Sequence, residues 1–348
     1  MQFFFGWQTV SRSKLSEKAR QRAQELAART DRAKDTRGIA LTPLERTIEG
    51  DHIRYGSVTC AIERARGRAE ITVHGPRTAP PGDVAGIHAA GIGFWPLTVA
   101  RELDDLILHL RANEEAVGLW VLRTVGDAER VEAYDRTLVD HASDWLVREI
   151  RLYLKRTLKR LDASSRSIFA LVEPGSCFAG TLLELALAAD RSYMLAGTRE
   201  GGDAPAAAVK LTPMNFGAYP MSNGLTRLAT RFLGEPGRVD DLKGRIGRDM
   251  EAEAASDAGL VTFTPDDIDW DDEVRLALEE RAAFSPDALT GMEASLRFAG
   301  PETLETKIFG RLSAWQNWIF QRPNAVGSKG ALHVYGTGQR SEFDRRRV

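Results

Sequence analysis

A small-residue turn that leads into an apolar helix carries the residues of this chain best suited to chemistry. In the stretch 175–187, GSCFAGTLLELAL, the thiol of Cys177 and the carboxylate of Glu184 are the only ionisable side chains. We expect a helix to begin at Thr181 and to place Glu184 in its first turn. The free backbone N–H groups of a helix N-terminus can hold a negatively charged oxygen. Cys177 and Glu184 are therefore candidates for catalysis, and Gly180 and Thr181 for an oxyanion or phosphate site.

Two elements must position this turn. The apolar run Ile168–Val172 is typical of a short strand that is buried on both faces. The stretch Thr181–Asp190 is too uniformly apolar for a surface helix, so we expect it to be central. Gly175 lets the chain turn sharply between the two.

Alternation of helices and strands before this unit predicts a largely parallel sheet. We expect a helix at Phe94–Ala112, a strand at Ala116–Thr124 and a helix at Ala142–Leu161, which leads to the strand at Ile168. Earlier, the partial alternation within Ile53–Val73 predicts an antiparallel pair. Further predictions are a loop at Pro76–Gly93, short strands at Val209–Leu211 and 260–263, and helices at Ser13–Lys34, Gly224–Leu233, Val274–Phe284, Pro286–Phe298 and Pro301–Phe320.

These elements divide the chain into four predicted regions. They are an N-terminal helix and linker (1–42), an α/β domain (43–270), a helical C-terminal extension (271–323) and a polar tail (324–348) that is partly disordered by composition. The aromatic residues Phe309, Trp315, Trp318 and Phe320 recur at helical spacing in the extension. Such a stripe favours packing in a core or at a dimer surface, and a cover for an acyl ligand is the alternative.

Composition excludes several classes of protein. The 348 residues have a formal net charge of −2, which gives no indication of nucleic-acid binding. No apolar run approaches the roughly 18 residues of a membrane span, and we expect no signal peptide. The two cysteines, Cys60 and Cys177, fit a reducing cytoplasm. The six histidines show no ligand spacing, so we predict no metal site.

Several motifs resemble the crotonase (enoyl-CoA hydratase/isomerase) superfamily. The run GSCFAGTLLELALAADRSYM is similar to its signature of a glycine-rich loop and a helix that begins with Glu, Leu and Ala. LTPMNFGAYPMSNGLTRLATRFLG and ASDAGLVTFTPDDID resemble later segments of the superfamily. Runs near the end, including SPDALTGMEASLRFAGPETLETKIFG and FDRRRV, resemble the C-terminal part of a ring-cleaving branch. This resemblance covers nearly everything after about Lys14.

The resemblance implies a fold, an activity and partners. The fold is an α/β, crotonase-like (ClpP/crotonase) core with a helical C-terminal extension. The activity is that of a carbon–carbon lyase in aromatic catabolism, which opens the ring of a cyclic dihydrodiol CoA thioester and releases formate. The CoA thioester is substrate, and no cofactor is needed. Gly180 and Thr181 would then contact the CoA thioester. The implied partners are the acyl-CoA substrate and either a second copy in a homodimer or a preceding catalytic crotonase domain.

Two departures from the superfamily keep a second interpretation open. A working site has a Gly-Ala-Asp loop after the strand that corresponds to Ala116–Thr124, whereas this chain reads VGDAERVEAYD. The second glutamate of hydratases would fall near Pro213. Glu184 is then either a catalytic acid or base, or a structural carboxylate at a helix N-terminus, and Cys177 is either reactive or a small buried thiol. The alternative function is a scaffold and dimerisation module with residual acyl-CoA binding.

Two further groups have open roles. Asp190 is predicted to be a structural acceptor or the partner of Arg191 or Arg227. The basic ending Arg345–Arg347 is predicted to be a solvated tail, with a salt bridge to a CoA phosphate as the alternative.

Overall fold

A computed structural model describes residues 2–5, 8–31, 38–300 and 302–347. The chain divides into two compact units, Met1–Ala40 and Leu41–Val348. In the first unit, strands β1 (Gln2–Phe5) and β2 (Gln8–Ser11) pair in antiparallel fashion and are followed by the 3₁₀ turn η1 (Arg12–Lys14) and helix α1 (Leu15–Ala27). Helix α1 lies within the predicted Ser13–Lys34, whose last residues are outside the described part, and it buries no side chain.

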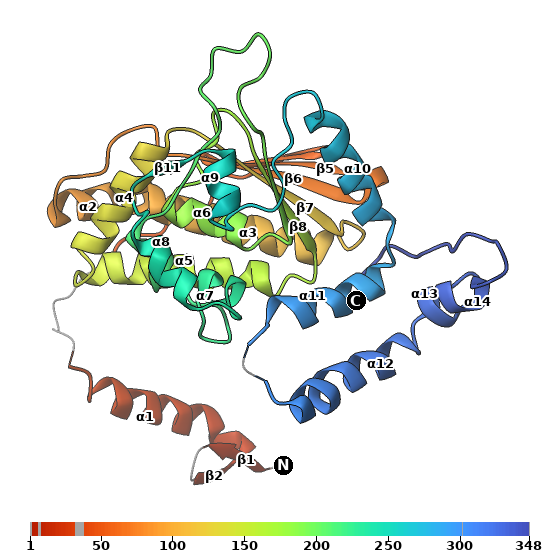
Figure 1. Cartoon of the computed structure of the whole chain (residues 1–348). Coiled ribbons are helices and arrows are strands. Elements are labelled where there is room, and N and C mark those ends of the chain that lie inside the picture. Colours follow the sequence, from red (N-terminus) through yellow and green to blue (C-terminus); the bar gives the residue numbers. More distant parts are fainter. Residues whose placement is uncertain (1, 6–7, 32–37, 301, 348) are drawn as a thin grey trace. The chain divides into compact units, whose positions relative to one another are not determined.

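The second unit is built on a seven-stranded sheet with its strands in sequence order (Figure 1). Neighbours from β3 to β6 are antiparallel, and neighbours from β6 to β9 are parallel. The strands are β3 (Thr47–Glu49), β4 (His52–Arg54), β5 (Val58–Glu63), β6 (Arg68–His74), β7 (Leu119–Val125), β8 (Ser167–Val172) and β9 (Arg191–Met194). The predicted α/β core is therefore confirmed, although the sheet is mixed rather than largely parallel, and the strand run Ile168–Val172 is fully buried.

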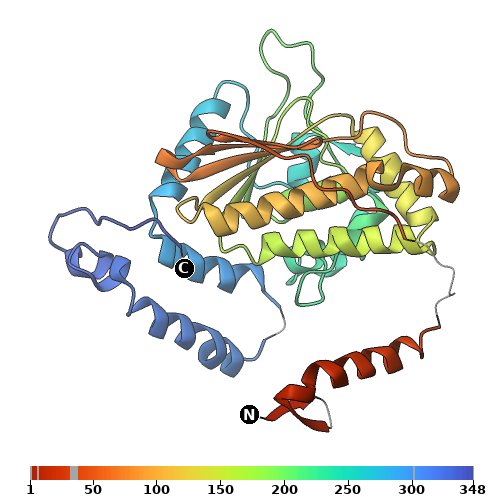
Figure 2. The same ribbon diagram turned by 180° about the vertical axis from the view of Figure 1, so that it is seen from behind.

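Helices cover both faces of this sheet. Helix α3 (Trp95–Asn113) lies against one face, and helix α5 (Trp145–Asp162) packs along α3 (Figure 2). Helix α10 (Trp270–Ala283) packs on the other face, where its Trp270 and Leu278 join Val121 and Phe169 in one apolar cluster. Because alternate strand residues point to opposite faces, Trp120 belongs to the layer on the α3 side, and it is fully buried.

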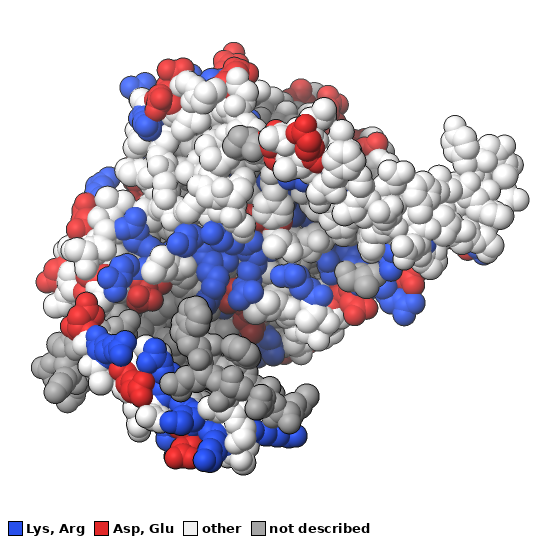
Figure 3. Space-filling view, turned by 90° about the horizontal axis from the view of Figure 1, so that it is seen from below, with Lys and Arg blue, Asp and Glu red and all other residues white. Residues whose placement is uncertain are grey.

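The other elements connect or extend this core. They are η2 (Arg64–Arg66), α2 (Val84–Ala90), η3 (Gly91–Gly93), α4 (Ala128–Asp140), α6 (Gly180–Leu187), β10 (Val209–Lys210), η4 (Pro213–Phe216), α7 (Arg227–Arg231), α8 (Gly237–Lys243), β11 (Asp249–Met250), α9 (Ala252–Asp257), α11 (Pro286–Arg297), the π-helical η5 (Thr306–Leu312), α12 (Ser313–Ile319), α13 (Pro323–Val326) and α14 (Ala331–Val334). Basic residues are frequent on α5, and Lys and Arg side chains gather in a band on the face seen in Figure 3.

Several local predictions were wrong. The expected loop at Pro76–Gly93 contains α2, which the side chain of Asp83 caps. Helix α4 was not foreseen. Its N-cap is Asp127, whose carboxylate accepts the N–H of Glu129 at 2.9 Å. Strand β9 was missed as well.

Two expected strands differ from the prediction. Val209–Lys210 pairs with β11 in a separate two-stranded sheet rather than joining the main one. In place of a strand at 260–263, an isolated bridge links Phe263 to Tyr193.

The basic ending is not a solvated tail. The guanidinium of Arg345 donates to the carbonyl of Ala65 at 2.9 Å, and the backbone N–H of Arg347 donates to the carbonyl of Glu115 at 3.1 Å. The last described residues are therefore held against the core beside the start of β7.

Candidate active site

Glu184 lies in the second turn of α6, not in the first turn as predicted, because the helix begins at Gly180. The residue is 1% exposed. One carboxylate oxygen accepts a hydrogen bond from Nδ2 of Asn215 at 2.8 Å, and the other lies 2.9 Å from Nη1 of Arg227. Burial raises the pKa of Glu184, and the charge of Arg227 opposes this shift.

Arg227 joins Glu184 to a second carboxylate. Its Nη2 lies 2.9 Å from both oxygens of Asp162 and also donates to the carbonyl of Leu158. All three charged side chains are almost fully buried. A carboxylate held in this way orders the surrounding helices and is not open to a substrate.

The N-terminus of α6 is occupied by a side chain of the same protein. Oδ2 of Asp135 accepts the backbone N–H of Thr181 at 2.9 Å and the hydroxyl of Thr212 at 2.7 Å, while Oδ1 accepts the hydroxyl of Thr181. Gly180 has a φ of +42°, and a Cβ at this position would overlap the carboxylate of Asp135. The N–H group that could hold an oxyanion therefore already holds the Asp135 carboxylate.

Asp135 is an unusual carboxylate. It is 1% exposed, and burial raises its pKa to about 6, although its hydrogen bonds with Thr181 and Thr212 lower it. The hydroxyl of Thr181 also lies 2.9 Å from that of Tyr219. Since desolvation disfavours the charged form, the three hydrogen bonds from Thr181 and Thr212 compensate only part of the cost.

Cys177 is buried in the turn before α6. Its backbone N–H donates to the hydroxyl of Thr124 at 2.9 Å, and burial raises the pKa of its thiol to about 11. The N–H of Gly126, which follows β7, donates to the carbonyl of Gly175 at 3.0 Å. The two loops that follow β7 and β8 thus bond to each other.

The segment around Pro213 forms hydrogen bonds with α6 and does not supply a second glutamate. Thr212 and Asn215 form a capping box around η4. Nδ2 of Asn215 also donates to the carbonyl of Gly180 at 2.9 Å. The predicted residues Gly180, Thr181 and Glu184 are thus brought into one buried network.

Sequence analysis missed Asp135, Asp162 and Asn215, which complete this network. Asp190 is a structural acceptor, as predicted, and binds the N–H of Ile168 at 2.6 Å. Its charged partner is Arg297, at 3.1 Å, so the expected pairing with Arg191 or Arg227 was wrong.

Two classes of site are not found in the described part of the chain. There, no cluster of three or more His, Cys, Asp or Glu side chains has the arrangement of a metal site. Nor does any described helix combine the length and the apolar character that crossing a membrane requires.

Comparison with solved structures defines the fold. The enoyl-CoA hydratase of Geobacillus kaustophilus HTA426 superposes with a TM-score of 0.58 at 17% identity, covering 84% of this chain and 98% of that one. The enoyl-CoA hydratase of Bacillus anthracis gives a TM-score of 0.56 at 17% identity, covering 80% and 96%. The chain therefore has the crotonase fold of the enoyl-CoA hydratase/isomerase proteins.

Comparison with curated proteins is more specific. The chain is 51% identical over 339 residues to the benzoyl-CoA-dihydrodiol lyase of Aromatoleum evansii. The match covers 97% of this chain and 60% of that lyase. No family model matches. The resemblance deduced from the motifs is thus confirmed: the chain is a crotonase-fold homologue of benzoyl-CoA-dihydrodiol lyase and spans about three-fifths of its length.

Proposed function

We propose that this chain is part of a benzoyl-CoA-dihydrodiol lyase of aerobic benzoate degradation. The reaction is the hydrolytic ring opening of 2,3-dihydro-2,3-dihydroxybenzoyl-CoA, with one water, or of its epoxide precursor, with two, to 3,4-dehydroadipyl-CoA semialdehyde and formate. The corresponding acid would form only by a separate oxidation of the semialdehyde. The supporting observation is the 51% identity that extends over 97% of the chain. The CoA thioester is the substrate, and the proposal includes no cofactor.

We further propose that this unit does not carry the chemistry of the reaction. Ring cleavage of this kind needs N–H donors for an enolate-like oxygen and a carboxylate that removes a hydroxyl proton. Here the N–H of Thr181 is bonded to Asp135, and Glu184 is paired with Arg227. We assign the chemistry to the remaining 40% of the lyase's length, since the match covers 60% of it. This unit then supports folding and assembly, with residual acyl-CoA binding at most.

A surface on η5 and α12 favours assembly with another protein surface. Phe309 is 74% exposed and Leu312 is 50% exposed, and Phe320 just after α12 is half exposed. Trp315 and Trp318 contact each other edge to face and line an open apolar groove of about 260 Å³ between α11 and α12. An apolar patch of this kind is typical of an interface. We propose that it contacts either a second copy in a homodimer or the catalytic crotonase domain.

We also propose a cytoplasmic location. Cys60 and Cys177 are both free thiols, which fits a reducing compartment.

Formate release during co-expression tests the lyase proposal. The chain would be produced together with the portion of the Aromatoleum evansii lyase that it does not match, and each would also be produced alone. We expect formate from the dihydrodiol substrate only when both are present. Equal release by the unmatched portion alone would show that this chain takes no part in turnover.

A further inference from the structure

An open pocket lies at the amino ends of β7 and β8, at the opposite end of the sheet from the turn before α6. Its volume is about 430 Å³. The lining comes from the end of α3, the loops before β7 and β8, and the last described residues: Leu108, Arg111, Ala112, Glu115, Ser164, Ser165, Arg166 and Arg347. Three of these eight residues are arginines and one is a carboxylate.

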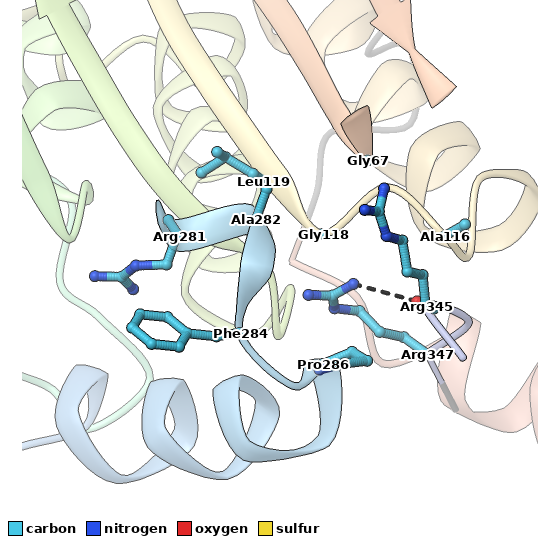
Figure 4. Close-up of a pocket in the computed structure, with 10 residues that line it drawn as sticks. All are labelled: Gly67, Ala116, Gly118, Leu119, Arg281, Ala282, Phe284, Pro286, Arg345 and Arg347. Atoms are coloured by element: carbon cyan, nitrogen blue, oxygen red, sulfur yellow. Dashed lines mark hydrogen bonds between the residues drawn. The ribbon is translucent and has the colours of Figure 1, made fainter. Parts of the chain in front are cut away.

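None of the three arginines forms an ion pair with a carboxylate in the described part of the chain. Arg166 is 6% exposed, and its guanidinium bonds only the carbonyls of Val117, at 2.8 Å, and Ser164, at 3.1 Å. Arg347 has a buried Nε without a partner, and its Nη1 reaches only the carbonyl of Arg345, at 3.4 Å (Figure 4). Buried guanidinium groups are normally paired with an anion, so this arrangement is electrostatically incomplete.

The arginines also repel one another. Burial, together with the nearby Arg111, lowers the pKa of Arg166 to about 10, and the carboxylate of Glu115 partly opposes this shift. Burial together with Arg166 lowers the pKa of Arg347 to about 10. An anion bound among them would remove this repulsion.

The backbone is shaped to hold the arginines together. The guanidinium of Arg347 lies over Gly118, where a Cβ would overlap it (Figure 4). Ser165 has a φ of +53° and is the only non-glycine residue with a positive φ among those the structure describes. Ser165 is half-buried, and its hydroxyl forms no hydrogen bond with another described residue. It is thus available as a further donor.

We propose that this pocket binds the phosphate group of a small organic molecule. Arginine is the residue best suited to phosphate because its planar fork can donate two parallel hydrogen bonds. The apolar side chains of Leu108 and Ala112 form one wall, and the volume exceeds that of a single phosphate. An organic phosphate ester therefore fits better than free phosphate. This site is separate from Glu184 and does not depend on the lyase proposal.

Calorimetric titration of the purified chain with ADP and with inorganic phosphate tests this site, at constant ionic strength. We expect saturable binding of both probes at one site per chain, with ADP the tighter because its nucleoside contacts the apolar wall. Tighter binding of inorganic phosphate than of ADP would show that the pocket recognises the phosphate group alone. This result would overturn the assignment to an organic phosphate ester. Absence of saturable binding with either probe would overturn the site.

Three variants make the test specific. Arg347→Gln and Arg111→Gln should each weaken ADP binding about tenfold, since each removes a charged donor. Glu115→Gln should tighten binding several-fold because it removes the one carboxylate of the lining. All three positions are at least partly exposed, so we expect folded proteins, to be checked by circular dichroism. Arg136→Gln on α4 is the control and should bind like the unmodified chain. Equal affinity in all four variants would contradict the proposal.

Discussion

The carboxylate of Asp135 accepts the backbone N–H of Thr181 at 2.9 Å, at the position where the sequence predicts an oxyanion site. A catalytic N–H donor must be free to bond the oxygen on which charge develops. Here the N–H of Thr181 is already used within the protein. We therefore expect the buried network of Asp135, Glu184 and Arg227 to act on stability and not on turnover.

The pH dependence of unfolding should reveal Asp135. Its pKa is raised from 3.8 to about 6 in the folded chain, so the folded state binds the proton more tightly than the unfolded state. The stabilising contribution is present below about pH 4 and is lost as pH rises through about 6, with a total on the order of 3 kcal/mol. In the variant Asp135→Asn, the free energy of unfolding in urea should not fall as pH rises through about 6. Parallel pH profiles for the two proteins would contradict the assignment.

Arg227 should be essential for stability. Replacement by leucine leaves Glu184 and Asp162 buried without a cation, which typically costs about 3–5 kcal/mol. Arg136→Leu on the exposed face of α4 is a matched control and should cost under about 0.5 kcal/mol. Urea denaturation of both variants measures the difference. Similar unfolding midpoints for the two would show that the buried ion pairs contribute nothing.

The thiols should be unreactive in the folded chain. Burial raises the pKa of Cys177 to about 11 and that of Cys60 to about 12, and both side chains are buried. Since the thiolate is the reactive form, a disulfide reagent at pH 8 should label neither until the chain is unfolded, when both react. The variant Cys60→Ser isolates Cys177. Rapid labelling of this folded variant would restore a reactive role for Cys177.

Local patterns and long-range contacts differed in how well they could be predicted. The strand at Ile168–Val172 and the helix after it were predictable because each is a continuous apolar run. The bond from Thr181 to Asp135 joins residues 46 positions apart, and that from Glu184 to Arg227 joins residues 43 apart. Neither spacing follows a secondary-structure period, so one sequence cannot reveal these pairs. Helix α4 could have been predicted from its N-capping residue Asp127. It was missed because the segment was compared with the Gly-Ala-Asp loop of the superfamily.

The exposed face of η5 and α12 should make the chain self-associate when it is purified alone. Light scattering after size exclusion should give a mass above 38.4 kDa at micromolar concentration. The double variant Phe309→Asp with Leu312→Asp should be monomeric, because it places charge in the apolar patch. Leu276→Asp on α10 is a control, since Leu276 is also exposed, and it should not change the mass. A strictly monomeric unmodified chain would argue against this interface.

Formate release by the purified chain, with and without Glu184→Gln, tests the central claim most directly. The claim is that the buried network around Glu184 does not catalyse ring cleavage. With the dihydrodiol or epoxide of benzoyl-CoA as substrate, we predict no formate from either protein. Formate release by the unmodified chain that disappears in Glu184→Gln, while the variant remains folded, would place a working active site in this unit and contradict the account.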